Sequence, residues 1–430
     1  MIVLALNELN MEYIKRYNSI GKLPNFKLLI DHGLHETTSE KVYELLEPWI
    51  QWTTVHTGLT YDEHKVYRLG DIVDRPDLRQ YFEELESQGI TIGTISPFNA
   101  ANRLRRAKFF VPDPWTQTPS SGGFLLKKLS RSVSRFVNSN ASGKVGLADI
   151  FWLLAGFVLL VRIKRWCTIF KMGMKFRKPG VKAAILDMIL LEVFVKLHKR
   201  TKPQFSHLFF NAGAHVQHHY LFNSEVYDGP FKNPEWYCPQ GWDPVYVVLE
   251  TYDRIIGDLL NTKEQIIGIT GLHQVPHETE TYYWRPFAHD QFLKLMGIKH
   301  DFNVIPRMSR DFLIELNSNE DAAEIESILK SYVDNINGNL VFSVDNRGKS
   351  LFVEVVYDKD VTDQLSFKSN LGNEIYDLKK KLVFVAIKNG KHDGMGYVFS
   401  NKKLDLPMIF ELKDTFNFIK QLALKDNAQR

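Results

Sequence analysis

Short apolar runs alternate along this chain with longer stretches of helical periodicity. The first apolar run is residues 2–6. The others are 91–95, 207–210, 265–269 and 382–387. Helical stretches such as 78–87 and 246–261 separate them. Strands that alternate with helices favour a parallel sheet, because each return to the sheet needs a crossover connection. We therefore expect an α/β fold with a doubly wound, mostly parallel sheet.

Two segments interrupt this alternation. Residues 113–201 are predicted to be a basic helical insertion, and residues 299–377 a small α+β lid. The lid is expected to contain strands at 310–316, 340–344 and 350–357 and a helix at 320–336. Its alternative is a purely structural extension. The core is then expected in three parts, 1–112, 202–298 and 378–430.

The composition is that of a folded globular protein, since 44% of the 430 residues are hydrophobic and 24% are charged. Two cysteines, Cys167 and Cys238, are too few for a disulfide framework or a Cys-rich zinc site, and they fit a reducing compartment. The opening MIVLALNELN lacks the basic residues and long apolar stretch of a secretory signal. We expect a cytoplasmic protein.

Positive charge is concentrated in one segment. Between Arg103 and Lys178 there are sixteen Lys and Arg against two Asp, so this segment carries +14 and leaves −10 for the remainder of the +4 chain. It also holds the longest uncharged apolar run, 150–161, whose twelve residues are too few to cross a bilayer. Such a segment is typical of peripheral binding to an anionic membrane on its inner face. The alternative is a helical hairpin with a solvated basic face. Nucleic acid is not an expected partner, because no known binding module is present.

Imidazoles and carboxylates follow the predicted strands where they end. Parallel sheets bind ligands outside the carboxyl ends of their strands. The segments that follow the strands contain Glu8, Glu47, His56, His215, His218, His219, His273, His277 and His392. Such groups on separate loops of one sheet edge indicate a metal or acid–base site. Asn99 follows the strand at 91–95, and Arg285 and Arg310 have the guanidinium fork that matches phosphate. Turn formation and surface ion pairs are the alternative roles of these three residues.

Five segments of the chain resemble the type I phosphodiesterase/nucleotide pyrophosphatase branch of the alkaline phosphatase superfamily. They are LALNELN, WIQWTTVHTGLTYDEHKV, AHVQHHY, GLHQ and HDGMGYVFS. The match touches most of the core and neither insertion. The resemblance implies an alkaline-phosphatase-like fold and two zinc-type ions held by three Asp and three His. It also implies a Thr or Ser nucleophile whose phosphorylated form is then hydrolysed.

The chain departs from this pattern at the charged positions. The three family histidines correspond to His218, His273 and His392. Asn7, Ala214 and Leu272 stand at the three aspartate positions, and Pro48 stands at the nucleophile. Losing three carboxylates removes the negative charge that offsets two divalent cations. Glu8 and Glu47, next to a lost aspartate and the lost nucleophile, are the candidate replacements.

We therefore expect a diverged phosphoesterase with a remodelled site. Its substrate is expected to be a phosphodiester or pyrophosphate, such as a nucleotide-sugar or a lipid-linked sugar in surface polysaccharide synthesis. The expected catalytic residues are Glu8, Glu47, His215 and His277. The expected substrate-binding residues are Asn7, His56, Asn99, Arg285 and Arg310. The expected metal ligands are His218, His273 and His392, holding one zinc or manganese ion or none. The alternatives are a metal-independent glycosyl- or phosphotransferase and a non-catalytic, ligand-binding pseudoenzyme.

Overall fold

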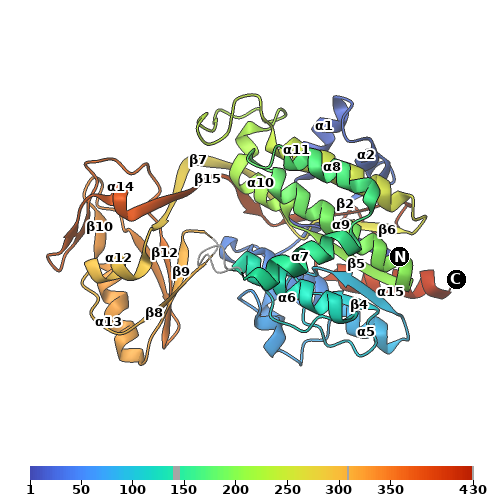
Figure 1. Cartoon of the computed structure of the whole chain (residues 1–430), viewed down its shortest axis with the longest axis horizontal. Helices are drawn as coiled ribbons and strands as arrows, with labels where there is room; N and C mark the ends of the chain where they lie inside the picture. The colour runs from blue at the N-terminus through green and yellow to red at the C-terminus, as the bar shows by residue number, and fades with distance from the viewer. Residues whose placement is uncertain (139–145, 308, 429–430) are drawn as a thin grey trace. The chain divides into compact units, whose positions relative to one another are not determined.

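The computed structural model of the chain describes residues 1–138, 146–307 and 309–428 (Figure 1). It divides into two compact units. Unit 1 comprises Met1–Pro276 and Gly390–Arg430, and unit 2 comprises His277–Asn389. Part of the predicted basic insertion, residues 139–145, lies outside the described residues.

Unit 1 is built on an eight-stranded sheet with the order β17-β2-β16-β6-β1-β5-β3-β4. The strands are β1 (Ile2–Leu6), β2 (Leu34–Thr38), β3 (Ile92–Ile95), β4 (Phe109–Val111), β5 (Phe205–Phe210), β6 (Ile266–Ile269), β16 (Met395–Ser400) and β17 (Ile409–Glu411). β1 pairs in parallel with β5 and with β6, whereas β16 runs antiparallel to both of its neighbours, β2 and β6. The predicted doubly wound, mostly parallel α/β fold is confirmed.

Helices cover both faces of this sheet because the strands are apolar on both sides. In β1, Ile2 and Leu4 pack into one hydrophobic cluster, while Val3 and Ala5 pack into another. Such continuous apolar strands are typical of parallel sheets buried on both faces. The first cluster includes residues of α1 (Met11–Ser19), α2 (Pro24–Ile30), α9 (Val181–Thr201), α10 (Ala212–Tyr220) and α11 (Pro244–Leu260). The second includes residues of α3 (Pro48–Thr57), α5 (Tyr81–Ser87) and α15 (Asp414–Ala428).

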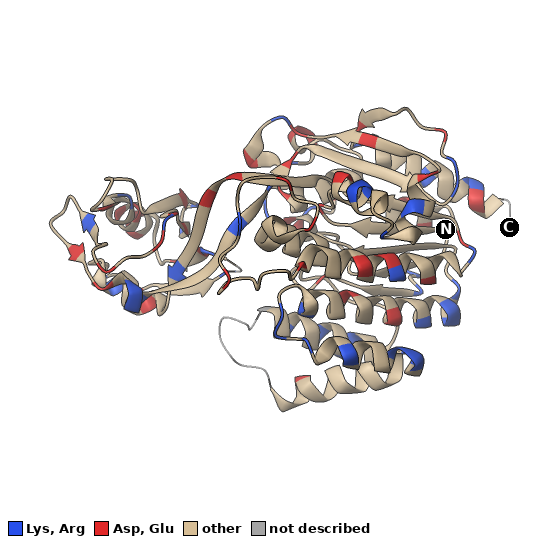
Figure 2. Ribbon diagram, turned by 90° about the horizontal axis from the view of Figure 1, so that it is seen from above, with Lys and Arg blue, Asp and Glu red and all other residues tan. Residues whose placement is uncertain are grey.

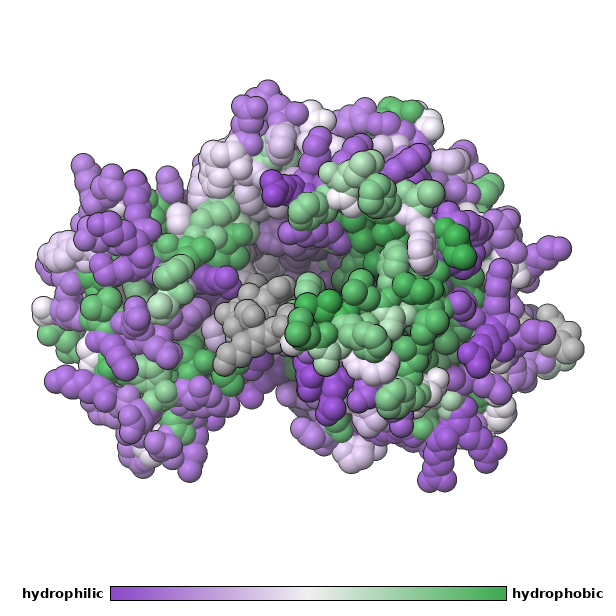
Figure 3. All heavy atoms as spheres, viewed as in Figure 1, coloured by the Kyte–Doolittle hydropathy of each residue, from purple (hydrophilic) through white to green (hydrophobic). Residues whose placement is uncertain are grey.

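The basic insertion contains α6 (Phe124–Asn138), α7 (Leu147–Leu160), α8 (Ile163–Gly173) and the longer helix α9. α9 belongs to the main core, since Ala184, Met188 and Leu191 are fully buried on it. α6 and α7 pack closely at Gly156, where an added Cβ would lie 2.7 Å from Leu129. Figure 2 shows blue residues along this part of the chain, and Figure 3 shows hydrophobic side chains gathered over α7.

Across the described residues, we find no helix whose length and apolar character would let it cross a membrane.

Unit 2 is an α+β module with its own hydrophobic core. One sheet has the order β11-β12-β9-β8 and another the order β10-β13-β14. The elements are α12 (His289–Leu295), β8 (Asn303–Pro306), β9 (Asp311–Glu315), α13 (Asn319–Lys330), β10 (Tyr332–Asp334), β11 (Phe342–Asn346), β12 (Ser350–Val355), β13 (Phe367–Ser369), β14 (Glu374–Ile375) and α14 (Leu378–Lys381). The unit contains the predicted segment 299–377 and is wider on both sides.

Two sequence predictions need correction in this region. The helix predicted at 320–336 ends at Lys330, because Tyr332 begins β10 and is fully buried there. The strand predicted at 382–387 does form, within β15 (Leu382–Asp393), but it pairs with β7 (His273–Pro286) rather than joining the central sheet. The strand that joins the central sheet instead is β16, which lies between β2 and β6 and is buried more continuously than β15.

A buried carboxyl group on α9 supports the start of α10. Asp187 Oδ2 accepts hydrogen bonds from the Ala212 N–H at 2.9 Å and from the Tyr252 hydroxyl at 2.7 Å. Burial raises the pKa of Asp187 to about 7, although these hydrogen bonds oppose the shift. The folded protein therefore keeps this proton at pH values where the unfolded chain has lost it.

We expect this group to make unfolding pH-dependent. Stabilisation from a raised pKa is complete below the unfolded value and is lost as the pH rises toward 7, so stability falls between about pH 4 and pH 7. Asp187→Asn keeps a hydrogen-bond acceptor oxygen at this position but removes the carboxyl group that titrates. Denaturant unfolding should therefore show the variant gaining about 2 to 3 kcal/mol on the wild type between pH 5 and pH 7.5. Parallel stability curves for the two proteins would contradict this.

Candidate functional site

Three polar segments meet at the edge of the central sheet where the parallel strands end. β1 ends at Leu6 and is followed by Asn7 and Glu8. β5 ends at Phe210, and α10 then carries His218. Because β16 is antiparallel, its beginning lies at this same edge, and His392 stands shortly before it. The topology therefore brings residues from the beginning, middle and end of the chain together.

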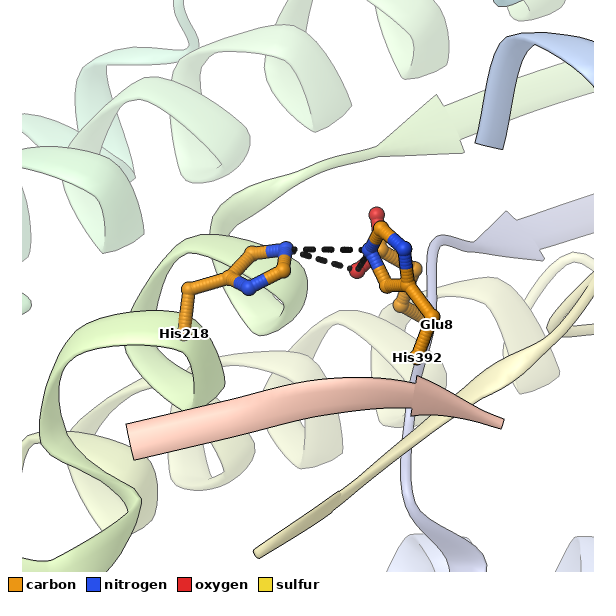
Figure 4. Close-up of side chains that lie close together, drawn as sticks. All are labelled: Glu8, His218 and His392. Carbon is orange, nitrogen blue, oxygen red and sulfur yellow. Dashed lines mark hydrogen bonds and ion pairs between the residues drawn. The ribbon is translucent and has the colours of Figure 1, made fainter. Parts of the chain in front are cut away.

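Glu8, His218 and His392 form a compact cluster in unit 1 (Figure 4). Glu8 Oε2 lies 2.9 Å from His218 Nε2 and 3.0 Å from His392 Nε2. The two Nε2 atoms are 3.3 Å apart. The three side chains come from different elements and point toward one another, as the figure shows. One carboxylate oxygen and two imidazole nitrogens thus converge on a single point.

The Glu8 carboxylate is held by amide groups. Oε1 accepts a hydrogen bond from Asn7 Nδ2 at 2.9 Å, and Oε2 accepts one from Gln274 Nε2 at 2.5 Å. The Trp52 indole N–H in turn donates to Asn7 Oδ1 at 2.7 Å, which fixes the orientation of that amide. Glu8 itself has a φ of 57°, in the left-handed region that non-glycine residues seldom occupy. A strained backbone held by several buried contacts is typical of a functional position.

Glu8 is charged in this setting. Its side chain is 2% exposed, and burial disfavours the carboxylate, but His392 and His218 favour it more strongly. The pKa of the Glu8 carboxyl therefore lies well below its ordinary value. The cluster offers one carboxylate oxygen and two imidazole nitrogens to a ligand.

The donor set fits a zinc-type ion. The three ligand atoms lie within 4.8 Å of one another. Bonds of about 2.0 to 2.1 Å in tetrahedral geometry place neighbouring ligand atoms about 3.3 Å apart, close to the separations of 2.9, 3.0 and 3.3 Å in the cluster. A carboxylate with two imidazoles is also a known composition for catalytic zinc sites, which keep a fourth position open.

Glu47 and His273 lie next to this cluster and outside it. Glu47 precedes Pro48 at the start of α3, and its Oε2 is 3.9 Å from His392 Nδ1. His273 Nε2 is 3.6 Å from Asp393 Oδ1, and its ring stacks on Tyr397. Both predicted residues are therefore at the same sheet edge, with Glu47 about one-third exposed.

The sequence profile of type I phosphodiesterases/nucleotide pyrophosphatases matches residues 1–271. The chain belongs to this family. A search of curated proteins finds no match to the chain. Three similar solved structures have 10% to 13% sequence identity. They are phosphonoacetate hydrolase from Sinorhizobium meliloti 1021 (13% identity, TM-score 0.45, 98% of this chain and 95% of that one), murine ectonucleotide pyrophosphatase/phosphodiesterase 5 (11%, 0.44, 99% and 95%) and the His 135 Glu mutant of TAB5 alkaline phosphatase (10%, 0.43, 98% and 97%).

The cluster accounts for part of the type I phosphodiesterase pattern. Two of the three histidines that correspond to the family pattern, His218 and His392, meet there. Glu8 brings a carboxylate beside Asn7, which stands at an aspartate position. His273 contacts Asp393 instead. Leu272 is fully buried and apolar. The described residues thus hold a three-ligand group in place of the six ligands that the family pattern implies.

Several predicted residues lie away from the cluster. His56 is fully buried in α3, where its Nε2 contacts the Phe98 carbonyl, so its place is the core rather than a substrate surface. Asn99 is also fully buried and donates to the Trp49 carbonyl and the Thr53 hydroxyl. His215 is exposed on α10 and lies against His219.

The remaining three predicted residues belong to unit 2. His277 Nε2 contacts the hydroxyls of Thr279 and Thr281, each at 3.1 Å. Arg310 lies over the Tyr283 ring and 3.6 Å from Glu354. Arg285 lies on β7 and is partly exposed. A catalytic role for His277 and a part in substrate binding for Arg285 and Arg310 stay predictions.

Two supporting residues were missed by sequence reasoning. Gln274 donates to the Glu8 carboxylate, and Gln217 Nε2 donates to the Glu8 carbonyl at 2.8 Å. Each lies directly beside a family histidine in the sequence, Gln274 after His273 and Gln217 before His218. That adjacency is the signal that would have pointed to them.

Proposed function

We propose that this chain is a phosphoesterase that works with one divalent metal instead of two. The observation that supports the proposal is the convergence of Glu8 Oε2, His218 Nε2 and His392 Nε2 within 3.3 Å. Zinc or manganese is the proposed ion. When bound, it supplies a Lewis acid that polarises a phosphoryl oxygen and offsets negative charge that develops during the reaction.

Asn7 and Gln274 act as positioning residues in this proposal. Their amides donate to the two oxygens of Glu8 and hold the carboxylate toward the two imidazoles. Hydrogen-bonding partners of this kind fix the geometry of ligand groups and commonly change affinity or activity 10- to 100-fold. Asn7 thus keeps a role at the site although it replaces an aspartate.

The reaction is proposed to be a single displacement by water. Pro48 has no nucleophilic group, and the nearby hydroxyls of Thr53 and Thr54 are buried and contact the Trp49 and Ile50 carbonyls. Glu47 is the carboxylate proposed as general base, since it is partly exposed beside His392. Water oxygen bonds to phosphorus, the bond to the leaving oxygen breaks, Glu47 takes the water proton, and solvent protonates the leaving group.

This mechanism predicts inversion at phosphorus. A covalent phosphoenzyme needs two displacements and retains configuration, whereas one displacement inverts it. We expect a chiral phosphorothioate diester, hydrolysed in oxygen-18 water and analysed by phosphorus NMR, to give inverted product. Chelator should suppress the reaction, and added zinc or manganese should restore it.

Other outcomes would replace the proposal. Retention of configuration would show a covalent intermediate and contradict the single displacement. Little release of product until a sugar or lipid acceptor is added would indicate the transferase alternative. Ligand-induced thermal stabilisation without turnover would indicate a pseudoenzyme.

The substrate proposed for this site is a nucleotide-sugar or a lipid-linked sugar, with surface polysaccharide synthesis as its setting. Both substrates contain the phosphodiester or pyrophosphate bond that the family name describes. We also propose a cytoplasmic location, peripheral on the inner face of the membrane, because the basic insertion combines positive charge with exposed apolar side chains.

A further inference from the structure

Two helices of unit 1 expose apolar stripes with the same spacing. On α7 the side chains of Leu147, Phe151, Leu154 and Val158 are 87%, 60%, 61% and 56% exposed. These positions follow one another at intervals of four, three and four residues and therefore lie on one face of the helix. On α8 the exposed residues Ile163, Cys167 and Phe170 follow the same intervals, and Met174, which caps the end of the helix, continues them.

α7 is more apolar than its contacts with the rest of unit 1 require. A helix that is hydrophobic on all sides is normally buried in protein or lipid. Gly156 and Leu160 on α7 are buried, and Gly156 approaches Leu129 of α6. The opposite stripe contacts no part of the described chain closely enough to be buried. Figure 3 shows this stripe as hydrophobic surface over α7.

Cations surround the two stripes. The exposed Lys and Arg residues of α6, α8 and the segment after α8 are Lys127, Arg131, Arg135, Lys164, Lys171, Lys175, Arg177 and Lys178. Asp149, the acidic residue of α7, is buried and accepts from the Ser132 hydroxyl and from Arg135. No exposed acidic group lies in the described residues from 124 to 178. Figure 2 shows this excess of blue over red.

We propose that the exposed faces of α7 and α8, together called the α7–α8 face, bind an anionic lipid bilayer without crossing it. Apolar and aromatic side chains then enter the boundary between headgroups and acyl chains, while the surrounding Lys and Arg contact anionic headgroups. A second copy of the chain fits the α7–α8 face less well, because a two-fold contact brings the same basic rim against itself.

Flotation with lipid vesicles tests the proposal. The wild-type chain should bind vesicles that contain about a third of phosphatidylglycerol in phosphatidylcholine, and binding should weaken as salt screens the charges. Phe151→Ser with Leu154→Ser should reduce the partition constant about tenfold or more, because it removes two inserting side chains. Phe287→Ser with Leu371→Ser is the matched control, since these side chains are 75% and 68% exposed in unit 2.

A probe on Cys167 supplies a second measurement. Cys167 is exposed on the α8 stripe, whereas Cys238 is fully buried, so a thiol-reactive environment-sensitive fluorophore should label Cys167 selectively. Its emission should shift to the blue with anionic vesicles and stay unchanged with phosphatidylcholine alone. The proposal is overturned if the protein floats with neither vesicle at low salt. It is also overturned if the probe shifts on self-association without lipid, as measured by light scattering.

Discussion

Replacing Glu8 by Gln is expected to abolish binding of the proposed divalent metal and to lower turnover by a hundredfold or more. The carboxylate is the anionic member of a group whose other ligand atoms are the Nε2 atoms of His218 and His392. Changing residues that merely support a metal ligand costs about 10- to 100-fold, so loss of the charged ligand should cost at least as much. Elemental mass spectrometry of the purified protein measures the metal, and a phosphodiester assay measures turnover.

Two further variants make this result specific. His215→Ala lies on the same helix as His218, is exposed and does not join the cluster, so it should keep wild-type metal content. Glu47→Gln should keep the metal and lose turnover, because Glu47 is proposed to accept a proton rather than to bind the ion. Stoichiometric metal in the Glu8→Gln protein, at wild-type affinity, would falsify the assignment of the cluster.

A second substitution is expected to change the free energy of unfolding rather than catalysis. Gly396 of β16 lies where an added Cβ would be 2.4 Å from the Gly271 carbonyl oxygen and 2.6 Å from the Thr37 hydroxyl. Both neighbours belong to segments that pack beside β16, and the carbonyl is backbone that cannot rotate away. We expect Gly396→Ala to destabilise the fold by about 3 kcal/mol, as overpacked cores do. Denaturant unfolding followed by circular dichroism measures this loss.

Gly173→Ala is the matched control for this substitution. Gly173 lies in α8 with no atom within 4 Å of an added Cβ. Alanine is favoured over glycine in helices by up to about 1 kcal/mol, so this variant should be as stable as the wild type or slightly more so. Equal unfolding midpoints for Gly396→Ala and the wild type would show that β16 approaches Gly271 less closely than described.

The sheet was predictable from sequence because its central strands are continuous apolar runs. Residues of β1, β3, β5 and β6 were all expected as strands, since strands buried on both faces need no polar alternation. The strand predicted at 382–387 was assigned to the wrong sheet. Its apolar residues do form a strand, β15, but the hydrophobic pattern of one segment does not identify the strand with which it pairs.

The site was predictable only in outline. Histidines and carboxylates at strand ends pointed to Glu8, His218 and His392, because a parallel sheet gathers such positions at one edge. The same rule also selected His56 and Asn99, whose side chains turn into the core and satisfy backbone groups there. The direction of these side chains depends on how α3 and the loop after β3 pack. The residue type alone does not determine that packing.

The three ligand atoms are contributed by positions that span nearly the whole sequence, since Glu8 and His392 are 384 positions apart. During synthesis, therefore, a nascent chain can complete most of the sheet and all of unit 2 before the last ligand leaves the ribosome. A chain truncated before His392 would present Glu8 and His218 and would lack the third donor. Binding of the proposed metal would thus report that synthesis has passed unit 2 and that the segment before β16 has brought His392 beside Glu8, which makes the site a checkpoint for a late step of folding.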